Sequence, residues 1–342
     1  MNKDVTKKSC LSDNERYADL INGTIFQGKQ MVHASDLTDM DSQTGMWSRK
    51  FSRGKWQRKL SYRDLIKKAA MGVGFVVIGI ENQEEVHYLM PLRSMAYDTA
   101  EYERQAADIS RQVRRRKGIT KAEFLSGFAK DSRLTPCITL VLYYGDDWDG
   151  SPDLQGILDM QGIPEEMRAY VNNYAIHLVE IRKLENTEVF RTDLKQVFDF
   201  IRCSGDKKKL KELVESEPAY QEMNEDAYEM AAAYADAKEL ITMKKFRGKD
   251  GKVDMCSGLR EWLADERQEG RQEGRQEGAL LQTISLVRKK VRKGMSAEEI
   301  AEWLEEDIIL IRDIVRIIKS NPGANDSKVV QLLSNSSRKG KL

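Results

Sequence analysis

The sequence of 342 residues contains few of the residue types that build several common functional sites. It has four cysteines and three histidines, and neither type recurs at the short spacings of a zinc ligand set. This scarcity argues against a multi-histidine or cysteine-based zinc centre. The scattered cysteines predict reduced thiols and a cytoplasmic protein, and the polar first thirteen residues predict no secretory signal.

Long apolar runs and an excess of one charge are also missing. The longest apolar stretch, near residues 72–80, is far too short to cross a bilayer, so we expect no membrane partner. Lysine and arginine number 56 against 55 aspartates and glutamates, for a net charge of +1. Any affinity for nucleic acid must therefore come from local segregation of charge.

Hydrophobic residues make up 40% of the chain, which is enough for a sizeable core. Continuous apolar runs near 75–80, 138–144 and 174–181 predict strands, and apolar residues at three- and four-residue spacing predict a long helix from Pro91 to about residue 116. Strands separated by long helices favour a mixed α/β sheet. A shorter helix over 12–20 is predicted before them, capped by Ser12 or Asp13.

The composition shifts to helix formers after residue 203. We predict helices over 207–217, 225–243, 279–293 and 297–318, followed by a disordered tail. Residues 267–278 repeat Arg-Gln-Glu-Gly three times. Because each glycine costs about 1 kcal/mol against alanine in a helix, the repeats are interpreted either as a solvated linker or as a helix that packs on a partner. The second interpretation predicts a homo-oligomer formed through the C-terminal helices.

Residues 49–68 form a basic run in which Asp64 is the only acid. The run has two interpretations. In the first it binds DNA, with its cations neutralising phosphates and its aromatic residues stacking on bases. In the second it is a solvated loop. The predicted DNA-binding residues are Arg49, Lys50, Arg53, Lys55, Trp56, Arg58 and Lys59. A second cluster, 114–117, is interpreted as a helix C-terminus that balances the helix dipole.

Asp64 and the triplet Glu81, Asn82 and Gln83 flank the first predicted strand. A hard divalent cation takes oxygen ligands, and two carboxylates at one sheet edge supply them. Alternation along the strand directs Glu81 and Gln83 to the same face. On spacing alone, two solvated acids and a surface amide are the commoner explanation.

Five segments in a fixed order make the pattern more specific. They are Ser-Asp-Asn-Glu-Arg-Tyr at 12–17, Arg-Asp-Leu at 63–65, Gly-Ile-Glu-Asn-Gln at 79–83, Pro-Leu-Arg-Ser-Met-Ala-Tyr at 91–97 and Thr-Leu-Val-Leu-Tyr-Tyr-Gly at 139–145. Together they resemble the Rpn family of recombination-promoting nucleases, also called putative transposases, within the PD-(D/E)XK nuclease superfamily. The resemblance covers about residues 10–200.

The resemblance implies a PD-(D/E)XK nuclease-like mixed sheet flanked by helices and a DNA endonuclease that uses Mg²⁺ or another divalent cation. Asp64 and Glu81 match the metal-binding carboxylates, and the backbone carbonyl of Asn82 is a further metal ligand. Gln83 stands where the wider superfamily usually has lysine. A neutral amide orients water but does not offset developing negative charge, so slow turnover is expected. The alternative is a DNA-binding or assembly protein that kept the fold and lost cutting.

Four further residues are assigned supporting roles. Asp13 or Glu15 supplies another acid, and the sequence does not choose between them. Arg93 and Tyr97, spaced i and i+4, share a helix face beside the site, where the guanidinium binds phosphate. The alternative is that Arg93 is a surface charge and Tyr97 packs at the edge of the core. A helix-turn-helix over 296–318 is disfavoured because its glutamates would repel phosphate.

The predicted organisation has five parts. Residues 1–204 form the nuclease-like domain and 205–265 a helical region. The repeat linker or helix covers 266–278, a helical hairpin covers 279–320, and the disordered tail covers 321–342.

Overall fold

A computed structural model describes residues 10–40, 43–52, 55–62, 64–72, 74–235, 237, 240, 247–248 and 251–339. For 43–62, 266, 269–270, 273 and 334–339 it describes the backbone only. The chain is mixed α/β, about 54% helical. It divides into two compact units, Met1–Leu259 and Arg260–Leu342.

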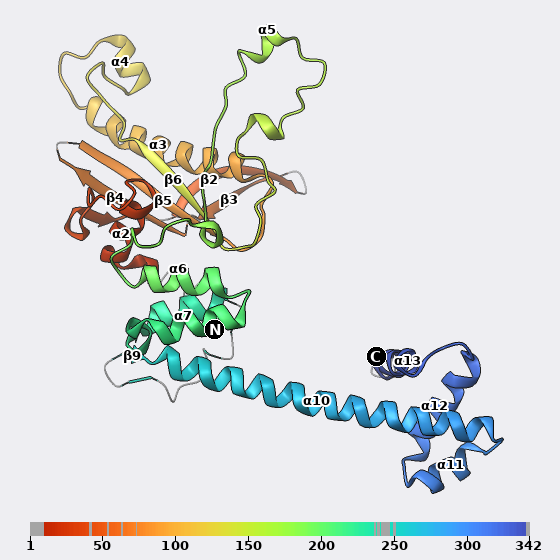
Figure 1. The fold of residues 1–342 in the computed structure, drawn as a ribbon. Helices are drawn as coiled ribbons and strands as arrows, with labels where there is room; N and C mark the ends of the chain where they lie inside the picture. Colours follow the sequence, from red (N-terminus) through yellow and green to blue (C-terminus); the bar gives the residue numbers. More distant parts are fainter. Residues whose placement is uncertain are drawn as a thin grey trace. The chain divides into compact units, whose positions relative to one another are not determined.

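A five-stranded mixed sheet forms the centre of the first unit (Figure 1). The strand order is β1 (Leu37–Asp39), β4 (Leu65–Met71), β5 (Gly74–Gln83), β6 (Cys137–Tyr143) and β7 (His177–Glu180). β1, β4 and β5 pair antiparallel, whereas β6 and β7 continue parallel to β5. The predicted mixed sheet is confirmed, and its three predicted strands are β5, β6 and β7.

Helices cover both faces of this sheet (Figure 1). α3 (Met90–Val113) begins with proline in its first turn and lies on the face of Thr139, whose hydroxyl donates to Asp98 at 2.7 Å. α2 (Asn14–Thr24) lies on the other face, where Lys67 of β4 donates to the Ser12 carbonyl at 2.6 Å. Lys67 is 1% exposed, so this cation of the basic run is a buried structural one.

Several elements of the first unit, β1 and β4 among them, have no counterpart in the sequence prediction. β2 (Gln43–Ser52) and β3 (Lys55–Tyr62) pair as an antiparallel two-stranded sheet, so the solvated-loop alternative for the basic run is wrong. α4 (Lys121–Ser126) follows the end of α3. Because α3 ends at Val113, the cluster 114–117 follows the helix and does not form its last turn.

The first three helices after residue 193 belong to the same compact unit as the sheet. They are α6 (Leu194–Cys203), α7 (Lys207–Ser216) and α8 (Glu225–Tyr234). Arg182, just after β7, donates to the carbonyls of Tyr144, Ile201 and Tyr234 at 2.8–3.1 Å, which ties the sheet to α6 and α8. The predicted boundary at residue 204 therefore divides a single packed body, whereas the two units meet at 259/260. Residues 241–243 of the predicted helix lie outside the described residues.

The remaining elements of this unit are short helices in its loops and a two-stranded antiparallel sheet formed by β8 and β9. They are η1 (Ala34–Asp36), η2 (Gln155–Ile157), α5 (Glu165–Arg168), η3 (Ile181–Lys183), η4 (Pro218–Gln221), β8 (Met223–Asn224) and β9 (Lys252–Val253).

The second unit is helical. α10 (Met255–Arg292) begins in the first unit and runs without interruption through the Arg-Gln-Glu-Gly repeats, so the repeats are helical, and their described side chains are exposed. Its C-terminal part packs with α11 (Ala297–Leu304), α12 (Ile308–Ser320) and α13 (Asp326–Lys339) around a core that includes Ile284.

Two predictions for this unit need correction. The single helix over 297–318 is two helices, because Glu305 adopts a left-handed backbone (φ 53°) and Asp307 caps α12. The predicted disordered tail contains α13, whose Val329 and Leu333, one helical turn apart, are buried in the core. Within the described residues, no helix combines the length and apolar character needed to cross a membrane.

Candidate active site at the end of strand β5

Glu81 is the centre of a polar cluster on the α3 face of the sheet. It lies inside β5 beside Val141 of β6 and is 3% exposed. Its Oε1 atom accepts hydrogen bonds from Gln83 Nε2 at 3.1 Å, Arg93 Nη2 at 2.5 Å and Tyr97 OH at 3.3 Å. The strand alternation and the i,i+4 helix spacing thus bring these four predicted residues together.

The charge of Arg93 is well supported at this position. Burial opposes a charged guanidinium, but the Glu81 carboxylate, the hydrogen bond with Tyr97 and the negative charge of Asp64 outweigh burial and raise the pKa of Arg93 above its ordinary value. Arg93 Nη2 also donates to the Tyr97 hydroxyl at 2.7 Å, and its side chain remains 32% exposed. The guanidinium is therefore held through its Nη2 atom, and part of the side chain remains accessible to a ligand.

Asp64 lies next to this cluster, immediately before β4. Antiparallel pairing of Leu65 with Ile80 sets Asp64 beside the end of β5. Its Oδ2 atom accepts from the backbone amide of Asn82 at 2.8 Å and from the Asn82 side-chain amide at 3.3 Å. Neither bond involves Oδ1, which accepts no hydrogen bond from the described residues and is open to a cation.

Tyr144 supports Asn82 from the opposite face of the sheet. Its hydroxyl donates to Asn82 Oδ1 at 2.9 Å, and its ring stacks on Tyr234 with centroids 3.7 Å apart. Burial raises the pKa of Tyr144 well above its ordinary value, so the hydroxyl keeps its proton and remains a donor. The sequence prediction did not assign Tyr144 a role, although it stands in one of the segments that carry the family resemblance.

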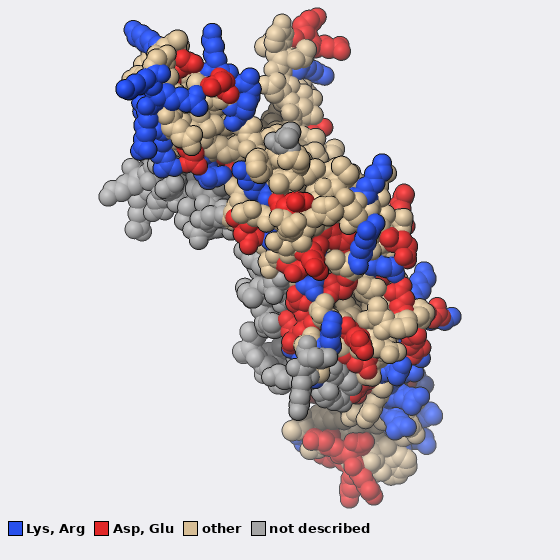
Figure 2. Space-filling model, turned by 90° about the vertical axis from the view of Figure 1, so that its left-hand side faces the viewer, with Lys and Arg blue, Asp and Glu red and all other residues tan. Residues whose placement is uncertain are grey.

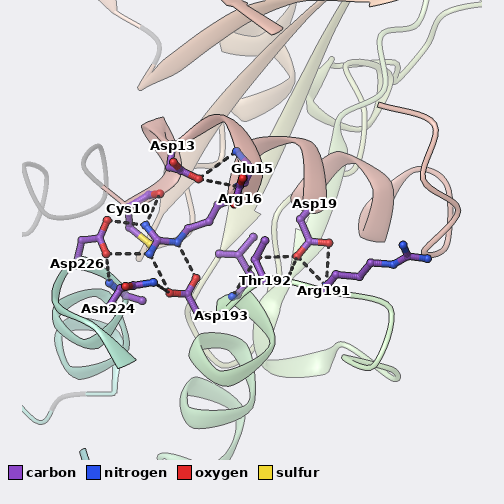
Figure 3. Close-up of polar contacts among 12 residues, drawn as sticks. Cys10, Asp13, Glu15, Arg16, Asp19, Arg191, Thr192, Asp193, Asn224 and Asp226 are labelled. Atoms are coloured by element: carbon purple, nitrogen blue, oxygen red, sulfur yellow. Dashed lines mark hydrogen bonds and ion pairs between the residues drawn. The ribbon is translucent and has the colours of Figure 1, made fainter. Parts of the chain in front are cut away.

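Asp13 and Glu15 do not join the cluster. Figure 3 shows Asp13 at the start of α2, where its Oδ1 atom accepts from the backbone amides of Glu15 and Arg16, both at 3.0 Å. Asp13 is thus the N-cap of a helix on the other face from Arg93 and Tyr97. The capping preference of aspartate accounts for Asp13, and neither acid forms a hydrogen bond with Glu81 among those found in the described residues.

The same helix is anchored by a buried arginine (Figure 3). Arg16 is 6% exposed, and its Nε and Nη2 atoms donate to the two oxygens of Asp193 at 2.6 and 2.8 Å. Its Nη1 and Nη2 atoms donate to Asp226 at 2.5 and 2.9 Å. This double fork joins α2 to α6 and α8, and it fixes one of the two helical layers that hold the sheet.

The donor set suits a magnesium ion better than a transition metal. The described residues contain no group of three or more histidine, cysteine or acidic side chains arranged around a metal position. Mg²⁺ is commonly bound by one or two carboxylates, with waters and substrate phosphates completing its shell. Asp64, Glu81 and the Asn82 carbonyl match that pattern, although the contact of Arg93 with Glu81 Oε1 competes with a cation there.

The basic run takes a hairpin form beside α3. The register of β2 and β3 sets Arg49 opposite Arg58, Lys50 opposite Gln57 and Ser48 opposite Lys59. Like charges in directly opposite positions destabilise an antiparallel pair. Arg53 lies outside the described residues, and the side chains of the other predicted DNA-binding residues, Trp56 among them, lie in the stretch described by backbone only.

No protein-family model, curated protein or solved structure matches the chain.

Proposed function

We propose that the protein is a metal-dependent DNA endonuclease with a PD-(D/E)XK-like core, linked to recombination or mobile DNA. The proposal rests on the positions of Asp64, Glu81 and Gln83 near the end of β5. This strand pairs antiparallel with β4 and parallel with β6. Asp64 and Glu81 would hold Mg²⁺ together with the Asn82 carbonyl. The cation would polarise the scissile phosphate and lower the pKa of an attacking water.

Arg93 supplies a positive charge that Gln83 lacks. The side-chain amide of Gln83 is engaged with Glu81, whereas the guanidinium of Arg93 lies 2.5 Å from the same carboxylate oxygen. A guanidinium binds phosphate oxygens through its planar fork. We propose that Arg93 turns from Glu81 to the phosphate when DNA and metal bind, and Gln83 orients the water.

The direct test is nicking of supercoiled plasmid by the purified full chain. Nicking that requires Mg²⁺ and stops with EDTA supports the endonuclease. DNA binding without nicking at any divalent-ion concentration would favour the second candidate, a DNA-binding or assembly protein that retained the nuclease-like core. The salt bridge between Arg93 and Glu81 is the observation that keeps this candidate open, because it neutralises a predicted metal ligand.

The β2–β3 hairpin is expected to contribute phosphate contacts. Changing Arg53, Lys55 and Arg58 to alanine should reduce the slope of log affinity against log salt by about 0.9 per lost duplex contact. The loss of like-charge repulsion across the hairpin predicts no fall in stability. Fluorescence anisotropy with a labelled duplex at several salt concentrations measures the slope, and an unchanged slope would remove the hairpin from the interface.

We also propose that the repeats in α10 pair two copies of the chain. Arg267, Arg271 and Arg275 are exposed and recur every four residues, and a Cβ added at Gly274 or Gly278 would meet no atom within 4 Å. A partner helix would set glutamate against this arginine stripe while glycine permits close approach. Deleting 267–278 should convert a dimer to a monomer in light scattering; a full-length monomer at tens of micromolar would refute the pairing.

A further inference from the structure

Residues 111–133 form a basic projection at the end of α3, here called the basic head. It contains eight lysines and arginines against two acids, Glu123 and Asp131. Figure 2 shows lysine and arginine side chains gathered over the end of α3 and over α4. This charge is concentrated in a chain whose net charge is only +1.

Both acids of the head are used inside it. Glu123 caps α4, where its Oε2 atom accepts from the Thr120 amide at 2.8 Å, and its Oε1 atom accepts from the Lys130 amide at 3.1 Å. These backbone hydrogen bonds lower the pKa of Glu123 and keep it ionised. Asp131 pairs with Arg116 at 3.1 Å.

Among the remaining cations, Arg111 pairs with Asp108 of α3. Four of them are exposed and make no ion pair with the described residues. They are Arg114, Arg115, Lys117 and Lys121.

The head is a built structure that is held against α3. α4 ends at Gly127, which has φ +67°, and a Cβ there would lie 2.2 Å from the hydroxyl oxygen of Ser110. Both the backbone conformation and this close approach require glycine. The fold therefore fixes the direction of the head, while Phe124 and Leu125 of α4 remain 53% and 69% exposed.

We infer that the basic head is a second DNA-contact surface. It binds the backbone of the same duplex at a distance from the candidate active site. This inference rests on the proposed function. Arg93 and Val113 lie on one helix, twenty residues apart, which corresponds to about 30 Å at 1.5 Å per residue. That separation equals about nine base pairs at 3.4 Å each. A straight duplex that lies along α3 would therefore span both Arg93 and the head.

Duplex DNA is favoured over an anionic membrane as the ligand. The cations include a run of three arginines, and the guanidinium fork matches phosphate better than the lysine ammonium does. The single helix α3 also connects the head to Arg93, which is proposed to bind the scissile phosphate. The exposed Phe124 and Leu125 suit a lipid surface as well, so vesicles belong in the test.

The test measures binding of a labelled thirty-base-pair duplex by the full chain in EDTA, where cleavage is absent. The head variant carries Arg114→Ala, Arg115→Ala, Lys117→Ala and Lys121→Ala. The matched control removes the same charge from α7 through Lys207→Ala, Lys208→Ala, Lys209→Ala and Lys211→Ala. The head variant should bind about tenfold or more weakly at physiological salt, with a salt slope reduced by about 0.9 per lost contact. The control should bind as wild type, and all three proteins should unfold at similar temperatures.

The outcomes separate this inference from the proposed function. Weaker binding by the head variant alone supports the head even when wild type nicks no plasmid. Equal binding by both variants overturns the inference, and plasmid nicking by wild type would still stand. Loss of binding to phosphatidylserine vesicles with unchanged DNA affinity also overturns it, because the head would then contact lipid.

Discussion

Asp64→Asn and Glu81→Gln are each expected to lower the rate of Mg²⁺-dependent plasmid nicking by at least about 10²–10³-fold. Each change removes the negative charge that holds the metal but keeps an oxygen in place. In Glu81→Gln this oxygen still accepts from Arg93 and Gln83, and in Asp64→Asn it still accepts from the Asn82 amide. Nicking rates from a supercoiled-plasmid time course measure the effect.

Alanine is the less informative replacement at Glu81. The sequence alone suggests that removing a carboxylate relieves repulsion and leaves stability unchanged. The structure shows that Glu81→Ala would take the acceptor from Arg93 and Tyr97, so a loss of stability would be mixed with the loss of activity. Glu103→Gln, an exposed acid on α3, is the matched control and should nick as wild type. Wild-type nicking by both site variants would place the chemistry elsewhere.

Arg16→Met is expected to lower the free energy of unfolding of the first unit by about 3–5 kcal/mol, because it breaks a buried ionic cluster from one side. The aliphatic part of the side chain is kept, but Asp193 and Asp226 lose the guanidinium that contacts both of them. Urea denaturation followed by circular dichroism measures the change. Glu15→Ala, the adjacent exposed position, is the control and should have little effect.

The stability loss in Arg16→Met should depend on pH in a defined direction. Burial alone would raise the pKa of Asp193, but the hydrogen bonds and charge of Arg16 lower it below its ordinary value. A lowered folded pKa means that the pair stabilises the protein above the unfolded pKa of about 3.9 and loses this effect as pH falls through the folded pKa. The difference between wild type and variant should therefore be largest near neutral pH and shrink below about pH 4. A difference that grows on acidification would contradict this assignment.

Local patterns predicted three strands of the five-stranded central sheet, β5, β6 and β7, because these patterns reflect burial. The run at 75–80 has apolar residues at every position, as expected for a strand covered on both sides, and it is the middle of β5. The hairpin was missed because its strands consist largely of polar and charged residues, so they lack the apolar alternation of a half-buried strand. The break between α11 and α12 was missed because a glutamate, not a glycine, adopts the left-handed conformation there.

The candidate site was predictable where local periodicity decides the geometry. Strand alternation brings Glu81 and Gln83 to one face, and helical spacing brings Arg93 and Tyr97 together. The position of Asp13 was not predictable, because only the three-dimensional packing decides which sheet face α2 covers. The helix α4 of the basic head was predictable from the sequence, because Thr120 and Glu123 have the spacing of a capping box.

The double fork of Arg16 also bears on the order in which the chain is made. Its two partners lie 177 and 210 residues further along the sequence. At about 5–20 residues per second, the ribosome needs roughly 10–40 s to deliver the second partner after the arginine emerges. Until then, Arg16 of α2 lacks its two carboxylate partners, and closing so long a loop is slow. A nascent chain therefore carries Asp64 and Glu81 well before α2, on the other face of the sheet, gains the contacts that fasten it to α6 and α8.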